Sequence, residues 1–181
     1  LTGAVLTLQD ASWLGEQVAR LQRKRPPEGF EALLGDSQSM RQLRARAQRV
    51  AVVDAPLMIL GETGTGKELV ARACHEASAR RSAPFLALNA AALPESLAES
   101  ELFGYAPGAF SGAQRGGKPG LLEMAGSGTV FLDEIGEMSP YLQTKLLRFL
   151  NDGTFRRIGG DRELRADVRI LSATHRDLAA D

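Results

Sequence analysis

A glycine-rich octapeptide between an apolar run and a helical pattern constrains this chain more than any other feature. The apolar run at 56–60 is typical of a short buried strand, and 69–74 is typical of the start of a helix. A glycine-rich turn at such a junction is a phosphate-binding loop when it ends in Gly-Lys, because its glycines let several backbone N–H groups face one anion. Lys67 can then reach the terminal phosphates. The octapeptide reads Gly61-Glu62-Thr63-Gly64-Thr65-Gly66-Lys67-Glu68.

The octapeptide departs from the general motif at its last position. A Ser or Thr whose hydroxyl helps to hold a metal ion normally follows the lysine, whereas this chain has Glu68. A glycine-rich turn that only caps a helix is therefore the alternative interpretation, and the motifs further along the chain decide between the two.

Composition limits the remaining classes of protein. The chain has 181 residues, 44% of them hydrophobic, which suits one α/β domain with a short extension, and its formal net charge of zero gives no polybasic character. Its single cysteine, Cys74, is expected to be a small buried side chain. No apolar run is long enough to span a membrane, and the ends of the chain suggest a piece of a larger cytoplasmic protein.

The first 30 residues are predicted to be separate from the rest. Residues 4–8 suit a strand, and 11–25 suit a helix whose apolar positions recur three and four apart. We interpret them as the end of an incomplete upstream domain followed by a signalling helix, with a solvated surface helix as the alternative. Pro-Pro-Glu-Gly breaks the helix, so that 26–30 is a linker and 31–181 the main domain.

Strand and helix patterns alternate regularly through the main domain. Such alternation predicts an α/β fold with a parallel sheet flanked by helices. Strands are predicted at 57–60, 84–88, 129–132 and 168–173, and helices at 38–53, 67–79, 94–102, 119–125 and 140–151. The arginines of the first of these helices are expected to form a solvated face or a subunit contact; they are Arg41, Arg44, Arg46 and Arg49.

Two carboxylates follow the apolar strand pattern at 129–132. Strands of a parallel sheet end at one edge, so Asp133 and Glu134 are expected beside the phosphate-binding loop. Asp133 is then suited to hold Mg²⁺, and Glu134 to polarise an attacking water. Together with the octapeptide, this pair predicts nucleoside triphosphate hydrolysis and makes the helix-capping alternative weak.

Asn89 ends another predicted strand and is expected near Glu134. Its amide can either restrain Glu134 or simply cap a turn, and the residues alone favour the turn. The stretch 101–113 is rich in glycine and small residues but contains Tyr105 and Phe110. Exposed aromatic side chains on such a loop usually contact a partner, although composition alone does not say which.

Three of these motifs, 61–68, 108–113 and 131–134, together resemble the AAA+ domain of bacterial enhancer-binding proteins, the ATP-driven activators of RNA polymerase that carries sigma-54. The resemblance covers about 30–181 and implies a P-loop AAA+ ATPase core that uses ATP and Mg²⁺. The family loop reads Gly-Ala-Phe-Thr-Gly-Ala, so this chain differs from it at Ser111.

The resemblance also implies roles that the residues alone do not. Glu68 fits the family pattern, and Asn89 matches the residue that restrains the catalytic glutamate. Thr174 or His175 matches the first sensor of the terminal phosphate. Leu34 and Gly35, within the segment 33–36, match residues that lie against adenine. The sigma-54 contacts are expected from Gly108, Ala109, Phe110, Ser111, Gly112 and Ala113.

A narrower resemblance links the segments 2–8 and 150–157 to the regulators that respond to aromatic amino acids, of the tyrosine-repressor and phenylalanine-hydroxylase-activator type. By this resemblance 1–25 are the end of a PAS-type sensor domain and its signalling helix. Some of these regulators lack the sigma-54 loop, and its presence in 108–113 favours the activator branch.

The family resemblance predicts a whole protein that remodels the closed complex of sigma-54 RNA polymerase in response to a small effector. It implies a ring homo-oligomer, expected to be a hexamer when active and a dimer when inactive, with DNA bound through a C-terminal helix-turn-helix. The lid and the arginine fingers fall outside this sequence, so residues 1–181 alone are expected to be inactive. Two rivals are a non-transcriptional AAA+ remodeller and a ligand-responsive DNA-binding regulator that acts without hydrolysis.

Overall fold

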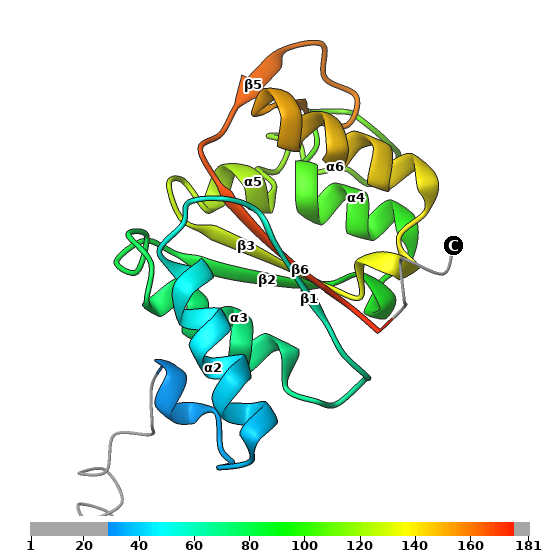
Figure 1. Cartoon of the computed structure of the whole chain (residues 1–181). Helices are drawn as coiled ribbons and strands as arrows, with labels where there is room; N and C mark the ends of the chain where they lie inside the picture. Colours follow the sequence, from blue (N-terminus) through cyan, green and yellow to red (C-terminus); the bar gives the residue numbers. More distant parts are fainter. Residues whose placement is uncertain (1–28, 176–181) are drawn as a thin grey trace, which may run out of the picture.

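The computed structural model describes residues 29–175, so the strand and helix predicted at 4–8 and 11–25 lie outside the described residues. The centre of the described part is a parallel sheet with the strand order β1-β6-β3-β2 (Figure 1). Its strands are β1 (Leu57–Leu60), β2 (Phe85–Asn89), β3 (Thr129–Asp133) and β6 (Arg169–Thr174). These bounds agree with the predicted strands to within one residue at each end.

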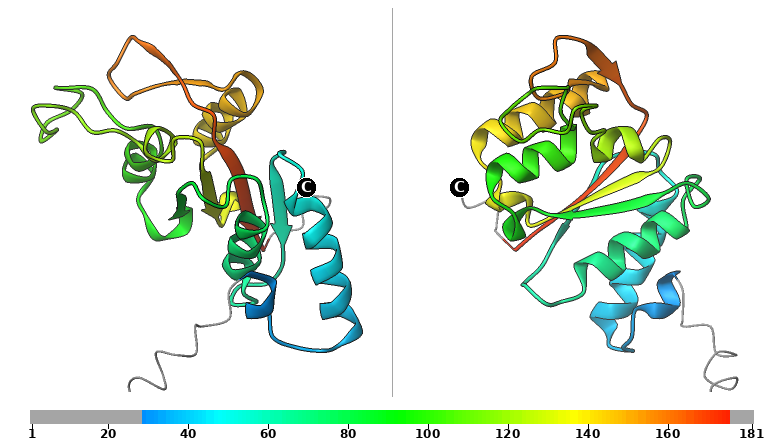
Figure 2. Two further views of the ribbon diagram at one scale, coloured as in Figure 1. Left: turned by 90° about the vertical axis from the view of Figure 1, so that its left-hand side faces the viewer. Right: turned by 180° about the vertical axis from the view of Figure 1, so that it is seen from behind.

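Helices cover both faces of this sheet (Figure 2). On one face, α2 (Gln38–Ala51) and α3 (Lys67–Glu76) enclose a core that includes Phe131 and Leu171. Side chains next to these in sequence point to the opposite face because strand residues alternate in direction, and they pack there against further helices. Those helices are α4 (Glu95–Phe103), α5 (Leu121–Met124) and α6 (Pro140–Asp152). The predicted α/β fold with a parallel sheet between helices is therefore confirmed.

Local sequence signals explain where several helices begin and end. Ser37 caps α2 by accepting a hydrogen bond from the backbone N–H of Met40, and Ser139 caps α6 in the same way. Gly153 ends α6 in a left-handed conformation with φ of 68°. None of the helices within residues 29–175 is long and apolar enough to cross a bilayer.

Short elements account for most of the differences from the predicted pattern. An antiparallel pair, β4 (Thr154–Arg156) and β5 (Glu163–Arg165), was not predicted, because three-residue strands are too short to reveal an alternating pattern. Three short 3-10 helices complete the described chain: η2 (Gly29–Ala32), η3 (Ala90–Ala92) and η4 (Ile135–Glu137).

An arginine joins three loops at the amino ends of the strands. Arg80 donates to both carboxylate oxygens of Asp54 at 2.8 Å, and to the Asp167 carboxylate at 2.7 Å. It also donates to the backbone carbonyls of Ser127 and Asp167. Since these loops precede β1, β3 and β6, the single side chain fixes the relative start of three neighbouring strands.

The chain leaves the body of the domain after Phe103 and returns at Gly120. Tyr105 closes the base of this excursion, because its backbone exchanges hydrogen bonds of 3.0 and 2.9 Å with Lys118. A Cβ atom on Gly104 would lie 2.5 Å from the Gly120 nitrogen, so the two ends touch through backbone alone. Tyr105 is only 7% exposed, and the prediction that it is an exposed aromatic of a mobile tip is wrong.

Candidate functional site

A cavity of about 570 Å³ opens at the carboxyl edge of the parallel sheet. It forms where the loop after β1 meets the ends of β2, β3 and β6, because parallel strands deliver their C-terminal residues to the same edge. The cavity brings together predicted site residues from separate stretches of the chain: Thr63, Gly64, Gly66, Lys67, Glu68, Asn89, Asp133, Glu134 and His175.

The glycine-rich octapeptide forms the wall of this cavity beside α3. Gly64 and Gly66 have φ of 82° and 86°, left-handed values that a residue with a side chain adopts only with strain. Gly66 is also the N-cap of α3, so the loop passes directly into the positive end of the helix dipole. The local geometry is that of an anion-binding loop at a helix N-terminus.

Lys67 folds back into this loop. Its ammonium donates to the carbonyls of Gly61 and Glu62, at 2.9 and 3.1 Å, and forms an ion pair with Glu134 at 3.3 Å. The side chains of Lys67 and Glu134 are only 6% and 9% exposed. Because water screens them little, the loop cation and the strand carboxylate neutralise each other within the cavity.

Glu134 is held on a second side by His175. The His175 Nδ1 lies 2.7 Å from the Glu134 Oε2, and the His175 backbone N–H donates to the same oxygen at 3.3 Å. The His175 contact, and then the Lys67 contact, lower the pKa of Glu134 below its ordinary value, against the opposing effect of burial. The carboxylate is therefore kept ionised.

The backbone of Glu134 is strained as well. Its φ of 53° makes it the one non-glycine residue with a left-handed backbone within residues 29–175. Such a conformation costs about 1–3 kcal/mol and persists only where surrounding contacts impose it. Thr63, Lys67 and His175 supply those contacts here.

Asn89 and Asp133 lie together at the adjoining strand ends. The Asn89 carbonyl oxygen accepts from the backbone N–H groups of Ala91 and Ala92, at 2.9 and 3.2 Å, and its amide nitrogen lies 3.5 Å from the Asp133 carboxylate. The turn-capping interpretation thus matches its hydrogen bonds. Its contact is with Asp133 and not with Glu134, so a restraint of Glu134 by Asn89 stays a prediction.

The remaining predicted residues lie on either side of this cavity. Thr174 is fully buried and its carbonyl accepts from the Gly61 N–H, so His175 is the sensor candidate that lines the cavity. Leu34 and Gly35 precede α2 and are not among the lining residues. The loop 108–113 projects from the body of the domain (Figure 2).

Phe110 is the exposed aromatic side chain of that loop. It is 47% exposed and packs edge-on against Tyr105, with ring centroids 5.0 Å apart. The loop also rests on a second segment, because Ala106 donates to the Ile158 carbonyl at 2.9 Å and Ala109 lies against Gly159. Half of the Phe110 ring is therefore available to a partner while its other half is anchored.

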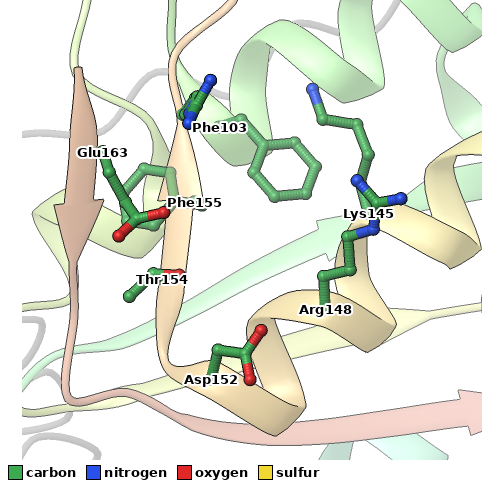
Figure 3. Close-up of a pocket in the computed structure, with 8 residues that line it drawn as sticks. Phe103, Lys145, Arg148, Asp152, Thr154, Phe155 and Glu163 are labelled. Carbon is green, nitrogen blue, oxygen red and sulfur yellow. The ribbon is translucent and has the colours of Figure 1, made fainter. Parts of the chain in front are cut away.

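A second cavity of about 340 Å³ lies between α4, α6 and β4 (Figure 3). Lys145 reaches across the Phe103 ring there, 4.8 Å from its centroid, and pairs with Glu99 at 2.8 Å. Phe103 and Phe155 are themselves buried, so the cavity offers little aromatic surface. It contains none of the residues that the sequence predicted for the site.

Comparison with protein families matches a family model described as the Sigma-54 interaction domain to residues 33–181. Among curated relatives, the HTH-type transcriptional regulatory protein TyrR of Enterobacter agglomerans is 51% identical over 178 residues, which are 98% of this chain and 34% of that protein. The anaerobic nitric oxide reductase transcription regulator NorR of Escherichia coli (strain SE11) is 58% identical over 146 residues, 81% of this chain and 29% of that protein. The chain thus spans about a third of the length of these relatives.

Solved structures agree with this relationship. NtrX of Brucella abortus in complex with ADP has a TM-score of 0.74 and 41% identity, over 94% of this chain and 37% of that one. The P-loop NTPase domain of an E. coli sigma-54 activator is only 19% identical but shares the fold, with a TM-score of 0.52 over 81% of this chain and 82% of that one. The resemblance to tyrosine-repressor-type regulators is likewise confirmed by the TyrR match. The chain therefore belongs to the sigma-54 interaction domain family, the P-loop AAA+ domain of bacterial transcription regulators.

Proposed function

We propose that this domain binds and hydrolyses ATP in the cavity at the sheet edge and uses the cycle to remodel the closed complex of sigma-54 RNA polymerase. The observation that carries the proposal is the 3.3 Å pair of Lys67 and Glu134, which joins a phosphate-binding loop to a carboxylate within one cavity. The ADP and ATP complexes of the related NtrX support the choice of nucleotide.

Nucleotide binding exchanges the partner of Lys67. The terminal phosphates are stronger acceptors than the loop carbonyls, so the Lys67 ammonium leaves Glu134 and the carbonyl of Gly61 for them. Backbone N–H groups at the start of α3 hold the remaining phosphate oxygens. Glu134 is then no longer neutralised by a cation and, still oriented by His175, accepts the proton of the attacking water.

Asp133 is suited to hold Mg²⁺ at this site. Its carboxylate lines the cavity, and oxygen is the ligand that Mg²⁺ prefers. Within residues 29–175 no three acidic, histidine or cysteine side chains gather as a metal site, which fits an ion held by one carboxylate together with substrate phosphates. When bound, Mg²⁺ neutralises charge on the phosphates.

The exposed half of Phe110 is the proposed contact with sigma-54. Burying a whole phenylalanine side chain contributes about 1.5–3 kcal/mol, so the exposed half can add a significant share of a contact that is made and broken in each cycle. Membership of the sigma-54 interaction domain family supports this partner over a non-transcriptional remodeller. A ring homo-oligomer, hexameric when active, would supply arginine fingers from a neighbouring subunit.

The whole protein is proposed to act as a regulator that responds to a small effector of the aromatic amino acid class and binds DNA through a helix-turn-helix. The similarity to TyrR, an HTH-type transcriptional regulatory protein, supports the DNA-binding part. The effector class is proposed from the resemblance of the segments 2–8 and 150–157 to the regulators that respond to aromatic amino acids. The rival is a ligand-responsive DNA-binding regulator that does not need hydrolysis.

Phe110→Ala in the full-length protein tests the proposal. The substitution should leave ATP hydrolysis within about twofold of wild type and abolish sigma-54 binding and open-complex formation. Leu97→Ala, which truncates a similarly exposed apolar residue on α4, is the matched control and should activate normally. Ser111→Thr, measured in the same assays, shows what the methyl group of the family's Thr contributes to sigma-54 binding and open-complex formation. Normal activation of a sigma-54 promoter by Phe110→Ala would favour the rival regulator.

A further inference from the structure

Arg44 does not belong to a solvated face. Its guanidinium donates to the backbone carbonyls of Leu33 and Gly35, at 2.5 and 2.6 Å. Arg41, one turn earlier on α2, donates to the next carbonyl, that of Asp36. Arg41 is still exposed, as expected for a solvated face, whereas Arg44 is only partly exposed. Both arginines bind the segment 33–36 to the helix that follows it.

These contacts determine the shape of the segment 33–36. At its start Leu33 is buried in the core cluster that also contains Val70 and Ala71, from the first turns of α3. Gly35 has φ of 113°, a conformation that residues with side chains rarely adopt. The planar fork of Arg44 holds the carbonyls on both sides of Leu34 and so fixes the backbone of Leu34 from its two neighbours.

Leu34 is left facing outward. It is 81% exposed, more than any other large apolar residue within residues 29–175. Within residues 29–175 neither its N–H nor its carbonyl forms a hydrogen bond. Leu34 therefore presents an apolar surface together with an adjacent backbone donor and acceptor, the combination that one edge of a purine base requires.

The segment lies near the phosphate-binding loop. Figure 1 shows α2 and α3 side by side, both beginning at the end of the pair where that loop lies, and the two helices pack against each other. Leu33 shares its cluster with Val70, one turn after Lys67. Leu34, which follows Leu33, therefore lies on the side of the domain that carries the first turns of α3 and the phosphate-binding loop.

We propose that Arg44 is a positioning residue for the base of the nucleotide. It sets base affinity and base selectivity by holding Leu34 between two anchored carbonyls, and it does not itself contact the nucleotide. The inference rests on the proposed function, since it requires ATP at the same site. A lysine cannot replace this arginine, because one ammonium on a flexible stem lacks the fork that spans both carbonyls.

The experiment separates the contribution of the base to nucleotide affinity from the contribution of the phosphates. Dissociation constants of ATP, GTP and inorganic tripolyphosphate, each with Mg²⁺, are measured on the full-length protein and on Arg44→Met. ATP should bind about tenfold more weakly, equivalent to roughly 1.4 kcal/mol. The ratio of the GTP and ATP constants should fall toward one, and tripolyphosphate should bind within about twofold of wild type.

Two further variants make the result decisive. Arg44→Lys keeps the charge and is expected to show the same selective loss, even where Arg44→Met does not fold. Arg46→Met is the matched control, because Arg46 lies on the same helix, is exposed and has no hydrogen bond or ion pair within the described part of the chain. Arg46→Met should bind all three ligands as wild type does.

The outcomes that contradict the proposal are distinct from those that contradict the proposed function. Unchanged ATP affinity in both Arg44 variants, or equal weakening of ATP and tripolyphosphate, would overturn the role of Arg44 alone. A wild-type protein that binds neither ATP nor tripolyphosphate would overturn nucleotide binding itself.

Discussion

Glu134 is restrained by the side chains of Thr63, Lys67 and His175 and by its own backbone. Lys67 and His175 occupy its two carboxylate oxygens, while φ of 53° stores strain in the peptide that carries it. A nucleotide that draws Lys67 away removes one of these contacts and leaves the other. In the proposed cycle, Lys67 thus neutralises the Glu134 carboxylate until a nucleotide draws the ammonium away.

Substitutions at this pair should separate binding from chemistry. Glu134→Gln removes the negative charge that accepts a proton, so ATP should bind as in wild type or more tightly while hydrolysis by the full-length protein falls at least about a hundredfold. Lys67→Ala removes the loop cation and should weaken ATP at least about tenfold, roughly 1.4 kcal/mol. Equilibrium binding and steady-state turnover measure the two effects, and wild-type turnover in Glu134→Gln would exclude Glu134 as the base.

The sequence predicts residues at this scale where a motif is contiguous. The octapeptide predicts a loop between a strand and a helix, and the pair Asp133-Glu134 predicts the end of a strand. The structure brings the two motifs together in one cavity. The roles of Arg44 and Tyr105 could not be predicted, because each depends on backbone atoms from another segment. Arg44 binds carbonyls nine and eleven residues before it, and Tyr105 pairs with Lys118.

At the scale of elements, the loops before β1, β3 and β6 depend on Arg80. The carboxylates of Asp54 and Asp167 raise the pKa of Arg80 further above its ordinary value, and Arg80 in turn lowers the pKa of Asp54 from its ordinary 3.8. A lowered carboxyl pKa contributes stability that is present above the unfolded value and is lost as the pH falls through the folded one. The contribution of Asp54 should therefore begin to fall below about pH 4 and be lost as the pH drops further, through the lowered pKa of the folded state.

Asp54→Asn tests this contribution. Since the Asp54 side chain is 56% exposed, the substitution should cost only about 0.5–1 kcal/mol at pH 7, and the difference from wild type should shrink toward pH 3. Urea unfolding of the full-length protein at pH 7, 5, 4 and 3 measures it. Asp161→Asn, at an exposed carboxylate without an ion pair in residues 29–175, is the control. A difference independent of pH would show that Asp54 acts by packing instead.

Element prediction succeeded where patterns were long and failed where they were short. The helix at 140–151 has enough residues to display apolar spacing, and the strand at 57–60 is marked by a continuous apolar run. Both occur within one residue of the predicted bounds. The helix predicted at 119–125 forms only from Leu121 to Met124, because Gly120 and Gly126 flank a single turn. The strands β4 and β5 are too short to show the alternation of apolar and polar residues that predicts a strand.

At the scale of the whole molecule, the proposed mechanism depends on which cations line the cavity. Its lining includes Lys67 and His175 but no arginine from residues 29–175. Arginine fingers raise phosphoryl-transfer rates by about 10³–10⁵ in related enzymes. In the proposed ring, a neighbouring subunit would supply that arginine.

Residues 1–181 expressed alone should accordingly bind ATP weakly and hydrolyse it at least about 10³-fold more slowly than the full-length protein. Isothermal titration and a phosphate-release assay on both proteins measure this. Hydrolysis at the full-length rate would mean that an arginine within the chain, such as Arg156, Arg157 or Arg162, supplies the charge. Arg157 is already paired with Glu123, so the exposed Arg156 would be examined first.

The backbone contact between Gly104 and Gly120 has a consequence for how such domains diversify. The excursion leaves and re-enters the body at nearly one point, so its removal would leave two ends already adjacent to be rejoined. Such a segment could be shortened or exchanged with loss of its own contacts to Ile158 and Gly159, while the sheet and the cavity keep their structure. Through a single deletion of this segment, a regulator could thus lose its contact with one form of RNA polymerase and keep its nucleotide site.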